Sequence, residues 1–155
     1  GAGACIMATT VIADSLVVDI SERIRLAGVN HNLSRRKIIT SVGEFIRRIV
    51  TVTTTEATFL TLSTVAGAGQ IIATDLKYLR LTNLDTTNYV TVCFKDTSGD
   101  TMYVKLEAGH SLIVHNDDLE VSASGAAFSA FSQWDTLTMD ANTASVDVEM
   151  VVASA

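Results

Sequence analysis

Five cationic side chains within residues 35–48 are the most distinctive charged group in the sequence. They are Arg35, Arg36, Lys37, Arg47 and Arg48. Arginine forks suit bidentate contacts with carboxylates or phosphates. Aromatic side chains that would stack on single-stranded nucleic acid are scarce nearby, so the group favours an acidic protein neighbour over nucleic acid. We interpret it as a candidate assembly interface, with a merely solvated basic face as an equal alternative.

Other residues that could do chemistry do not form a recognisable pattern. His110 and His115 are five residues apart in one expected strand, so they point to opposite faces, and His31 lies in a distant connector. Acidic residues cluster at 117–120 and at 96–100 without the spacing of a full calcium loop. No serine lies in a nucleophile-elbow pattern. We therefore expect a protein that is not an enzyme, with no catalytic residue, no metal site and no cofactor.

Composition and charge exclude several classes of function. The chain has 155 residues and a net charge of −6, which suggests one globular domain. Residues 1–55 carry seven Lys/Arg against four Asp/Glu, whereas residues 56–155 carry four against thirteen. An acidic body argues against direct nucleic-acid binding. No apolar run approaches the ~20 residues that would span a bilayer, so we expect no membrane association.

Residues 75–115 carry the clearest structural pattern. They alternate apolar and polar side chains over four short segments, which predicts strands. Residues 83–88 and 96–100 are rich in Asn, Asp, Ser, Thr or Gly and suit tight turns, and Ala108-Gly109 separates the last two strands. We expect these strands to form a β-meander.

The flanking segments predict further strands and one ambiguous region. Residues 11–26 read as an early strand or an extended arm, 45–54 and 58–64 as a hairpin, and 119–123, 134–139 and 146–152 as strands. Residues 34–44 read as a loop or short helix, and a helix through residues 35–48 stays open as an alternative. Roughly nine or ten short strands predict an antiparallel, jelly-roll-like β-sandwich. We expect an N-terminal arm over residues 1–30 and a sandwich over 31–155. Residues 1–6 are either left over from cloning or an upstream extension of the protein.

Three segments together resemble a known family. They are LRLTNLDTTNYVTV (79–92), VKLEAGHSLIV (104–114) and ANTASVDVEMVVAS (141–154). This arrangement resembles small all-β virion structural proteins of tailed bacteriophages over about residues 75–153. Asn83, Leu84, Asp85 and Asn88 match the family's turn, and Gly109 matches its corner, where a proline usually precedes the glycine. The resemblance implies structural turns and no catalytic residue.

The resemblance implies a place in a virus particle. It suggests a capsid cement or decoration protein that binds the outer capsid surface and stabilises the shell. The expected partners are copies of itself, with a trimer favoured, and a major capsid protein. The protein would be made in the host cytoplasm and assembled on the virion exterior. A phage tail or fibre-base component is the nearest alternative.

Two other functions stay open. A jelly roll could bind carbohydrate by stacking on Tyr89, Tyr103, Phe131 and Trp134, although only 6% of residues are aromatic and Trp134 suits the core better. A self-assembling filament subunit could donate an N-terminal strand to its neighbour. No signal sequence is visible, which counts against an extracellular filament unless a leader has been removed.

Overall fold

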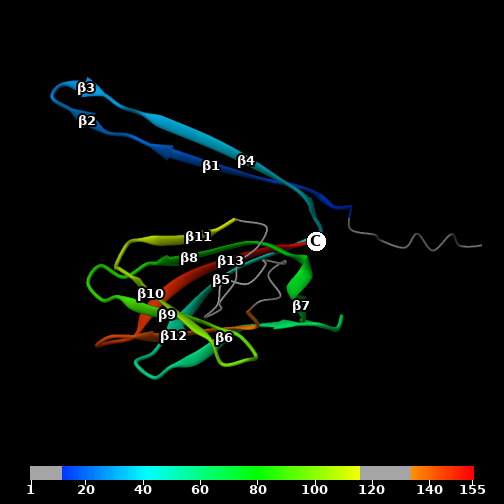
Figure 1. The fold of residues 1–155 in the computed structure, drawn as a ribbon. Helices are drawn as coiled ribbons and strands as arrows, with labels where there is room; N and C mark the ends of the chain where they lie inside the picture. The colour runs from blue at the N-terminus through cyan, green and yellow to red at the C-terminus, as the bar shows by residue number, and fades with distance from the viewer. Residues whose placement is uncertain (1–11, 116–133) are drawn as a thin grey trace, which may run out of the picture. The chain divides into compact units, whose positions relative to one another are not determined.

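The computed structural model describes residues 12–115 and 134–155, and these residues form an all-β protein. They divide into two compact units, residues 1–43 and residues 44–155 (Figure 1). A 3₁₀ turn, η1 (Ala73–Asp75), interrupts the strands. Across these described ranges no helix is long and apolar enough to cross a membrane. The strand content of the described residues confirms the expected all-β fold class.

The first unit is one long β-hairpin, which we call the N-terminal hairpin (Figure 1). Strand β1 (Asp14–Glu22) pairs antiparallel with β4 (Leu33–Val42), and β2 (Arg25–Leu26) pairs with β3 (Val29–Asn30) near the tip. Ala27 and Gly28 connect β2 to β3 with φ values of 48° and 81°. Two successive positive φ angles give a type I′ turn, whose twist matches that of the flanking strands.

The ambiguous region is a strand, so both the loop and the helix interpretations of residues 34–44 are wrong. Ile38, Ile39 and Thr40 are β-branched and favour a strand, and Ile38 and Ile39 lie opposite Val17 and Leu16 of β1. Residues 31–43, which we expected within the sandwich, consequently belong to the hairpin. This moves the boundary of the arm from residue 30 to residue 43.

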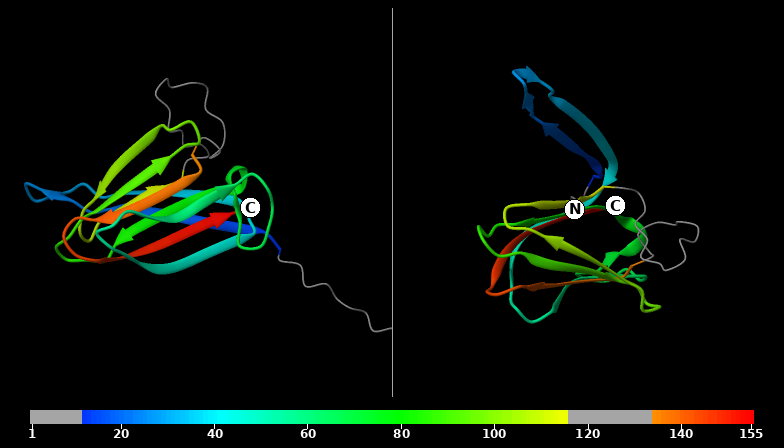
Figure 2. Two further views of the ribbon diagram at one scale, coloured as in Figure 1. Left: turned by 90° about the horizontal axis from the view of Figure 1, so that it is seen from below. Right: turned by 60° about the vertical axis from the view of Figure 1, so that its left-hand side comes forward.

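The second unit is a sandwich of two sheets, which Figure 1 and Figure 2 show as separate layers. One sheet has the order β11-β8-β13-β5, formed by Ser111–Val114, Leu76–Asn83, Val146–Ser154 and Glu44–Val52. The other has the order β10-β9-β12-β6-β7, formed by Thr101–Leu106, Val90–Lys95, Thr136–Ala141, Ala57–Ser63 and Ile71–Ile72. The chain alternates between the sheets in the manner of a jelly roll, as the sequence predicted.

The expected β-meander over residues 75–115 is wrong, although its four strands are present. Strands β9 and β10 do form a hairpin. Strands β8 and β11 lie in the opposite sheet and pair with each other. The expected hairpin of residues 45–54 and 58–64 is wrong for the same reason, because β5 and β6 also lie in different sheets. In each case the connecting turn crosses between the layers.

The main cluster of buried apolar side chains lies within the second unit, and Val18 and Ile39 of the N-terminal hairpin are also buried. Trp134 and Phe94 are fully buried and meet edge to face, with ring centroids 5.0 Å apart. Val146, Val148 and Met150 point inward from β13, as their alternation with Asp147 and Glu149 predicted. The sandwich thus has its own core. Residues 1–6 and the strand expected at 119–123 lie outside the described residues.

Candidate assembly site

The structure divides the basic group between the two units. Arg35, Arg36 and Lys37 lie on β4, whereas Arg47 and Arg48 lie on β5. Side chains of a strand alternate between its faces, so neighbours in the sequence do not share a surface. Consecutive cations on each strand therefore point to opposite faces of that strand, and the candidate interface stays a prediction.

Within the hairpin, Arg36 is engaged by an acid on the neighbouring strand. Its Nε donates to Asp19 Oδ1 at 2.7 Å and its Nη2 to Asp19 Oδ2 at 3.1 Å, which is a bidentate pair. The hydrogen bond from Arg36 lowers the pKa of Asp19 below its ordinary value. Arg35 and Lys37 lie on the opposite face and make no ion pair with any described residue. Neither charge is therefore neutralised by a described carboxylate.

The hairpin also exposes apolar side chains, which the sequence reading did not single out. Val17 and Ile38 lie opposite each other and are 48% and 54% exposed. Leu26 and Val29 form a second such pair near the tip and are also exposed. The sequence does contain an indication of this exposure. Apolar residues occupy both alternating sets of positions in β1, so burying one face of the strand leaves the apolar residues of the other face exposed. Among the described residues β1 and β4 pair only with each other, and an isolated two-stranded ribbon is marginally stable in water.

On the sandwich, Arg47 belongs to a cross-strand ion cluster. Its Nη2 donates to Glu149 Oε2 at 2.7 Å, and Arg80 Nη2 donates to Glu149 Oε1 at 2.6 Å. The cluster joins β5, β13 and β8 on the outer face of their sheet. The hydrogen bond from Arg47, followed by that from Arg80, lowers the pKa of Glu149. Arg47 is therefore ion-paired within the sheet, while its side chain is 65% exposed.

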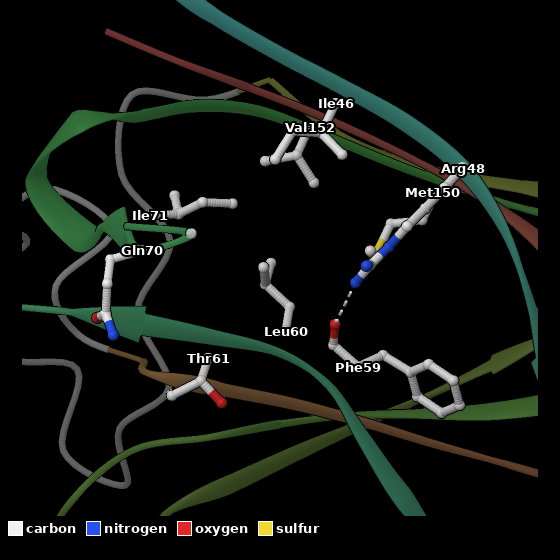
Figure 3. A pocket seen from close by; sticks show the side chains of 10 residues that line it. Ile46, Arg48, Phe59, Leu60, Thr61, Gln70, Ile71, Met150 and Val152 are labelled. Atoms are coloured by element: carbon white, nitrogen blue, oxygen red, sulfur yellow. Dashed lines mark hydrogen bonds between the residues drawn. The ribbon is translucent and has the colours of Figure 1, made fainter. Parts of the chain in front are cut away.

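Arg48 occupies an inward-facing position of the same strand, in line with Ile46 and Val50, which pack against the core. Its Nη2 donates to the backbone oxygen of Phe59 on β6 at 3.3 Å, across the gap between the two sheets (Figure 3). Arg47 and Arg48 thus lie on opposite faces of β5, because consecutive side chains of a strand point to opposite faces.

Asn83 is the centre of a buried corner at the end of β8. It has no exposed surface, and its Nδ2 donates to the backbone oxygens of Asn88 at 2.9 Å and of Leu106 at 3.1 Å. Its Oδ1 accepts from the backbone nitrogen of Asp85 at 2.9 Å. One side chain thereby ties the end of β8 to the start of β9 and to the end of β10.

The remaining residues of the resemblance complete this corner. The Asp85 carboxylate accepts from the backbone nitrogen of Asn88 at 2.6 Å, a bond that lowers the pKa of Asp85. The backbone nitrogen of Gly109 donates to Asn83 O at 3.0 Å, and Gly109 has a φ of 72°, which glycine adopts without strain. The structure places Asn83, Asp85, Asn88 and Gly109 together, and their contacts are internal to the sandwich.

The aromatic side chains considered for carbohydrate stacking are dispersed. Trp134 is fully buried in the core, so it offers no face to a sugar ring. Tyr103 is 64% exposed, while the ring of Tyr89 is covered by Lys105, whose Nζ lies 4.4 Å from its centroid. Phe131 lies outside the described residues. These positions give little support to a stacking platform.

The acidic residues and histidines serve turns where they can be described. Asp96 Oδ1 accepts from the backbone nitrogens of Ser98 at 3.0 Å and Asp100 at 2.8 Å, which closes the β9–β10 turn. His110 Nδ1 lies 2.9 Å from Ala108 O. No group of three His, Cys, Asp or Glu side chains gathers around a possible metal position in residues 12–115 and 134–155. Asp117, Asp118 and Glu120 fall outside these ranges.

Comparisons with known proteins do not assign the chain to a family. No family model matches it, and no curated protein matches it. One solved chain is similar over 95% of this chain and 93% of its own length, with 12% identity and a TM-score of 0.45. It comes from work described as "Bacillus endospore appendages form a novel family of disulfide-linked pili". A likeness this distant does not establish a shared fold or function.

Proposed function

We propose that this protein is a non-enzymatic structural subunit that assembles with copies of itself, with the N-terminal hairpin as the connecting element. The observation that carries this proposal is the exposed apolar pair Val17–Ile38 on a ribbon whose strands pair only with each other among the described residues. Burying such side chains against a neighbour removes apolar surface from water. It also supplies the packing that a two-stranded ribbon lacks.

The distribution of charge supports contacts between copies. Residues 1–43 carry five Lys/Arg against three Asp/Glu, a balance of +2, and residues 44–155 carry six against fourteen, a balance of −8. The hairpin of one copy is thus attracted to the acidic sandwich of another, with Arg35 and Lys37 free of internal ion pairs in the described residues. Such attraction steers association and weakens as salt is added.

The finer function we propose is that of a capsid decoration protein. It is supported by the resemblance of residues 75–153 to small virion structural proteins of tailed phages, and by a sandwich that carries its own core. For such a role we expect a small closed oligomer, with the trimer that the resemblance favours. A filament subunit, the second candidate, is favoured by the outer edges of β1 and β4, which pair with no further strand among the described residues and can accept one.

A double substitution in the hairpin tests the proposal. We expect the wild-type chain to form oligomers in light scattering at low micromolar concentration, and Val17→Thr/Ile38→Thr to dissociate at least tenfold more readily. Threonine keeps a β-branched side chain and removes apolar surface. Val65→Thr, at a residue 69% exposed on the other unit, is the matched control and leaves assembly unchanged.

The outcome also separates the two finer functions. Closed oligomers of fixed mass support the decoration protein, and growth that continues with concentration supports the filament subunit. A wild-type chain that stays monomeric up to about 100 μM would refute self-assembly, because the dissociation constant of any oligomer would then exceed about 100 μM. Equal assembly of the wild type and the double variant would refute the role of the hairpin.

A further inference from the structure

A cavity of about 290 Å³ lies between the two sheets at one side of the sandwich (Figure 3). It is bounded by β5 and β13 of one sheet and by β6 and β7 of the other. Apolar and polar residues both line it: Ile46, Phe59, Leu60, Ile71, Met150 and Val152 are apolar, and Arg48, Thr61, Gly69 and Gln70 complete the lining. The cavity is therefore partly open to solvent, with an apolar part next to the core and a polar part beside it.

Arg48 provides a positive charge at this cavity. Arg48 is an exposed residue of β5 that lines the cavity, and its Nη2 donates one hydrogen bond of 3.3 Å to Phe59 O. No carboxylate among the described residues lies within ion-pair distance of its guanidinium, whereas the neighbouring Arg47 is paired with Glu149. A guanidinium has five N–H donors, so most of the donors of Arg48 are available to a ligand.

Protection of the sheet edge is a simpler account of Arg48. An inward-pointing charge on an edge strand discourages pairing with another chain, and β5 is at the edge of its sheet. That account explains a charge at this position. It does not explain why the cavity beside the charge is lined by apolar side chains such as Leu60, Ile71 and Val152.

We propose that the cavity binds a small amphipathic carboxylate, with its head group on Arg48 and its apolar tail against Leu60, Ile71 and Val152. The guanidinium fork matches a carboxylate in geometry and charge. A cavity of roughly 150 Å³ accommodates benzene, so about 290 Å³ suits a ligand of about ten non-hydrogen atoms. Octanoate has this size. This site is independent of the proposed self-assembly.

Methyl NMR of the full-length protein tests the site with sodium octanoate as the probe. We expect saturable shifts of the Leu60, Ile71, Met150 and Val152 methyl signals, with a dissociation constant on the order of 1 mM or tighter for a ligand of this size. Octan-1-ol, which lacks the charge, and acetate, which lacks the tail, should each bind at least fivefold more weakly.

Two adjacent substitutions separate recognition from a general change in the fold. Arg48→Gln should weaken octanoate binding at least fivefold, whereas Arg47→Gln, on the opposite face of the same strand, should change it less than twofold. Absence of saturable methyl shifts up to 10 mM octanoate, about ten times the dissociation constant expected from ligand size, would overturn the proposal. Equal binding of octanoate by Arg48→Gln and the wild type, or equal binding of octan-1-ol and octanoate, would do the same. Shifts of these methyl signals with protein concentration alone would place a second copy in the cavity and would also overturn it.

Discussion

Replacing Asn83 with alanine should destabilise the sandwich more than its size suggests. The side chain of Asn83 is fully buried and makes three hydrogen bonds, to the backbone of Asp85, Asn88 and Leu106. Alanine removes all three and leaves two carbonyl oxygens and one N–H without these partners. The Leu106 oxygen is the most buried of the three, and water is least able to replace its lost donor.

The expected magnitude follows from the burial of the abandoned groups. An unsatisfied buried polar group costs about 1–3 kcal/mol, and the partly buried ones cost less because water reaches them. We therefore expect Asn83→Ala to lower the free energy of unfolding by about 3 kcal/mol in total. With a urea dependence of about 2 kcal/mol per molar, this moves the unfolding midpoint down by about 1.5 M.

Urea unfolding followed by tryptophan fluorescence measures this change, because Trp134 lies in the core. Asn88→Ala is the matched control, since it removes an amide from the same corner. The Asn88 side chain accepts a bond from Thr143 at an exposed position, so the control should cost about 1 kcal/mol or less. A loss below about 1 kcal/mol for Asn83→Ala, or equal losses for the two variants, would refute the reasoning.

Three further predictions concern other parts of the fold. The pKa of Glu149 is lowered from its ordinary value of 4.5, so its stabilising effect is present above that pH and is lost as the pH falls through the lowered pKa. The difference in unfolding free energy between the wild type and Glu149→Gln, measured by urea unfolding, should therefore shrink from pH 6 to pH 3. A difference that stays constant over this range would contradict the assignment. Gly109→Ala meets no neighbouring atom but must adopt a φ of 72°, so it should cost about 1–2 kcal/mol in the same assay, and an unchanged midpoint would argue against this turn. Ala27→Asn favours the positive φ of 48° at the hairpin tip and should slow amide hydrogen exchange of β2 and β3 several-fold, while faster exchange would exclude the type I′ turn.

The strands could be predicted from the sequence because their pattern is local. Val146, Val148 and Met150 alternate with Asp147 and Glu149, and this alternation alone requires one buried and one polar face. The pairing of the strands could not be predicted in the same way. The Asn- and Asp-rich turn that follows β8 has the chemistry of a hairpin turn, yet it carries the chain to the opposite sheet.

The region before β5 shows how a distant partner decides an ambiguous segment. Ser34 could cap a helix, and Ile38 and Val42 fit helical spacing, so local signals left a helix possible. In the structure, β4 pairs with β1 along most of its length. That pairing satisfies the backbone of both strands, and no local property of residues 34–44 could reveal it.

The candidate interface stays a prediction, because sequence proximity does not determine which side chains share a face. Arg47 and Arg48 are adjacent, yet one bonds to Glu149 on the outer face and the other points between the sheets. The exposed pair Val17–Ile38 depends on the register of β1 against β4, which the sequence does not show. A pattern that could have indicated it is the presence of apolar residues on both faces of β1.

The most direct test of the account compares the full-length chain with residues 44–155 alone. The core cluster lies wholly within residues 44–155, so the shortened chain should fold, with a cooperative urea transition and a buried tryptophan signal. Light scattering at equal concentration should then find the full chain assembled and the shortened chain monomeric. A folded shortened chain that assembles to the same mass as the full chain would contradict the claim that the N-terminal hairpin connects the copies.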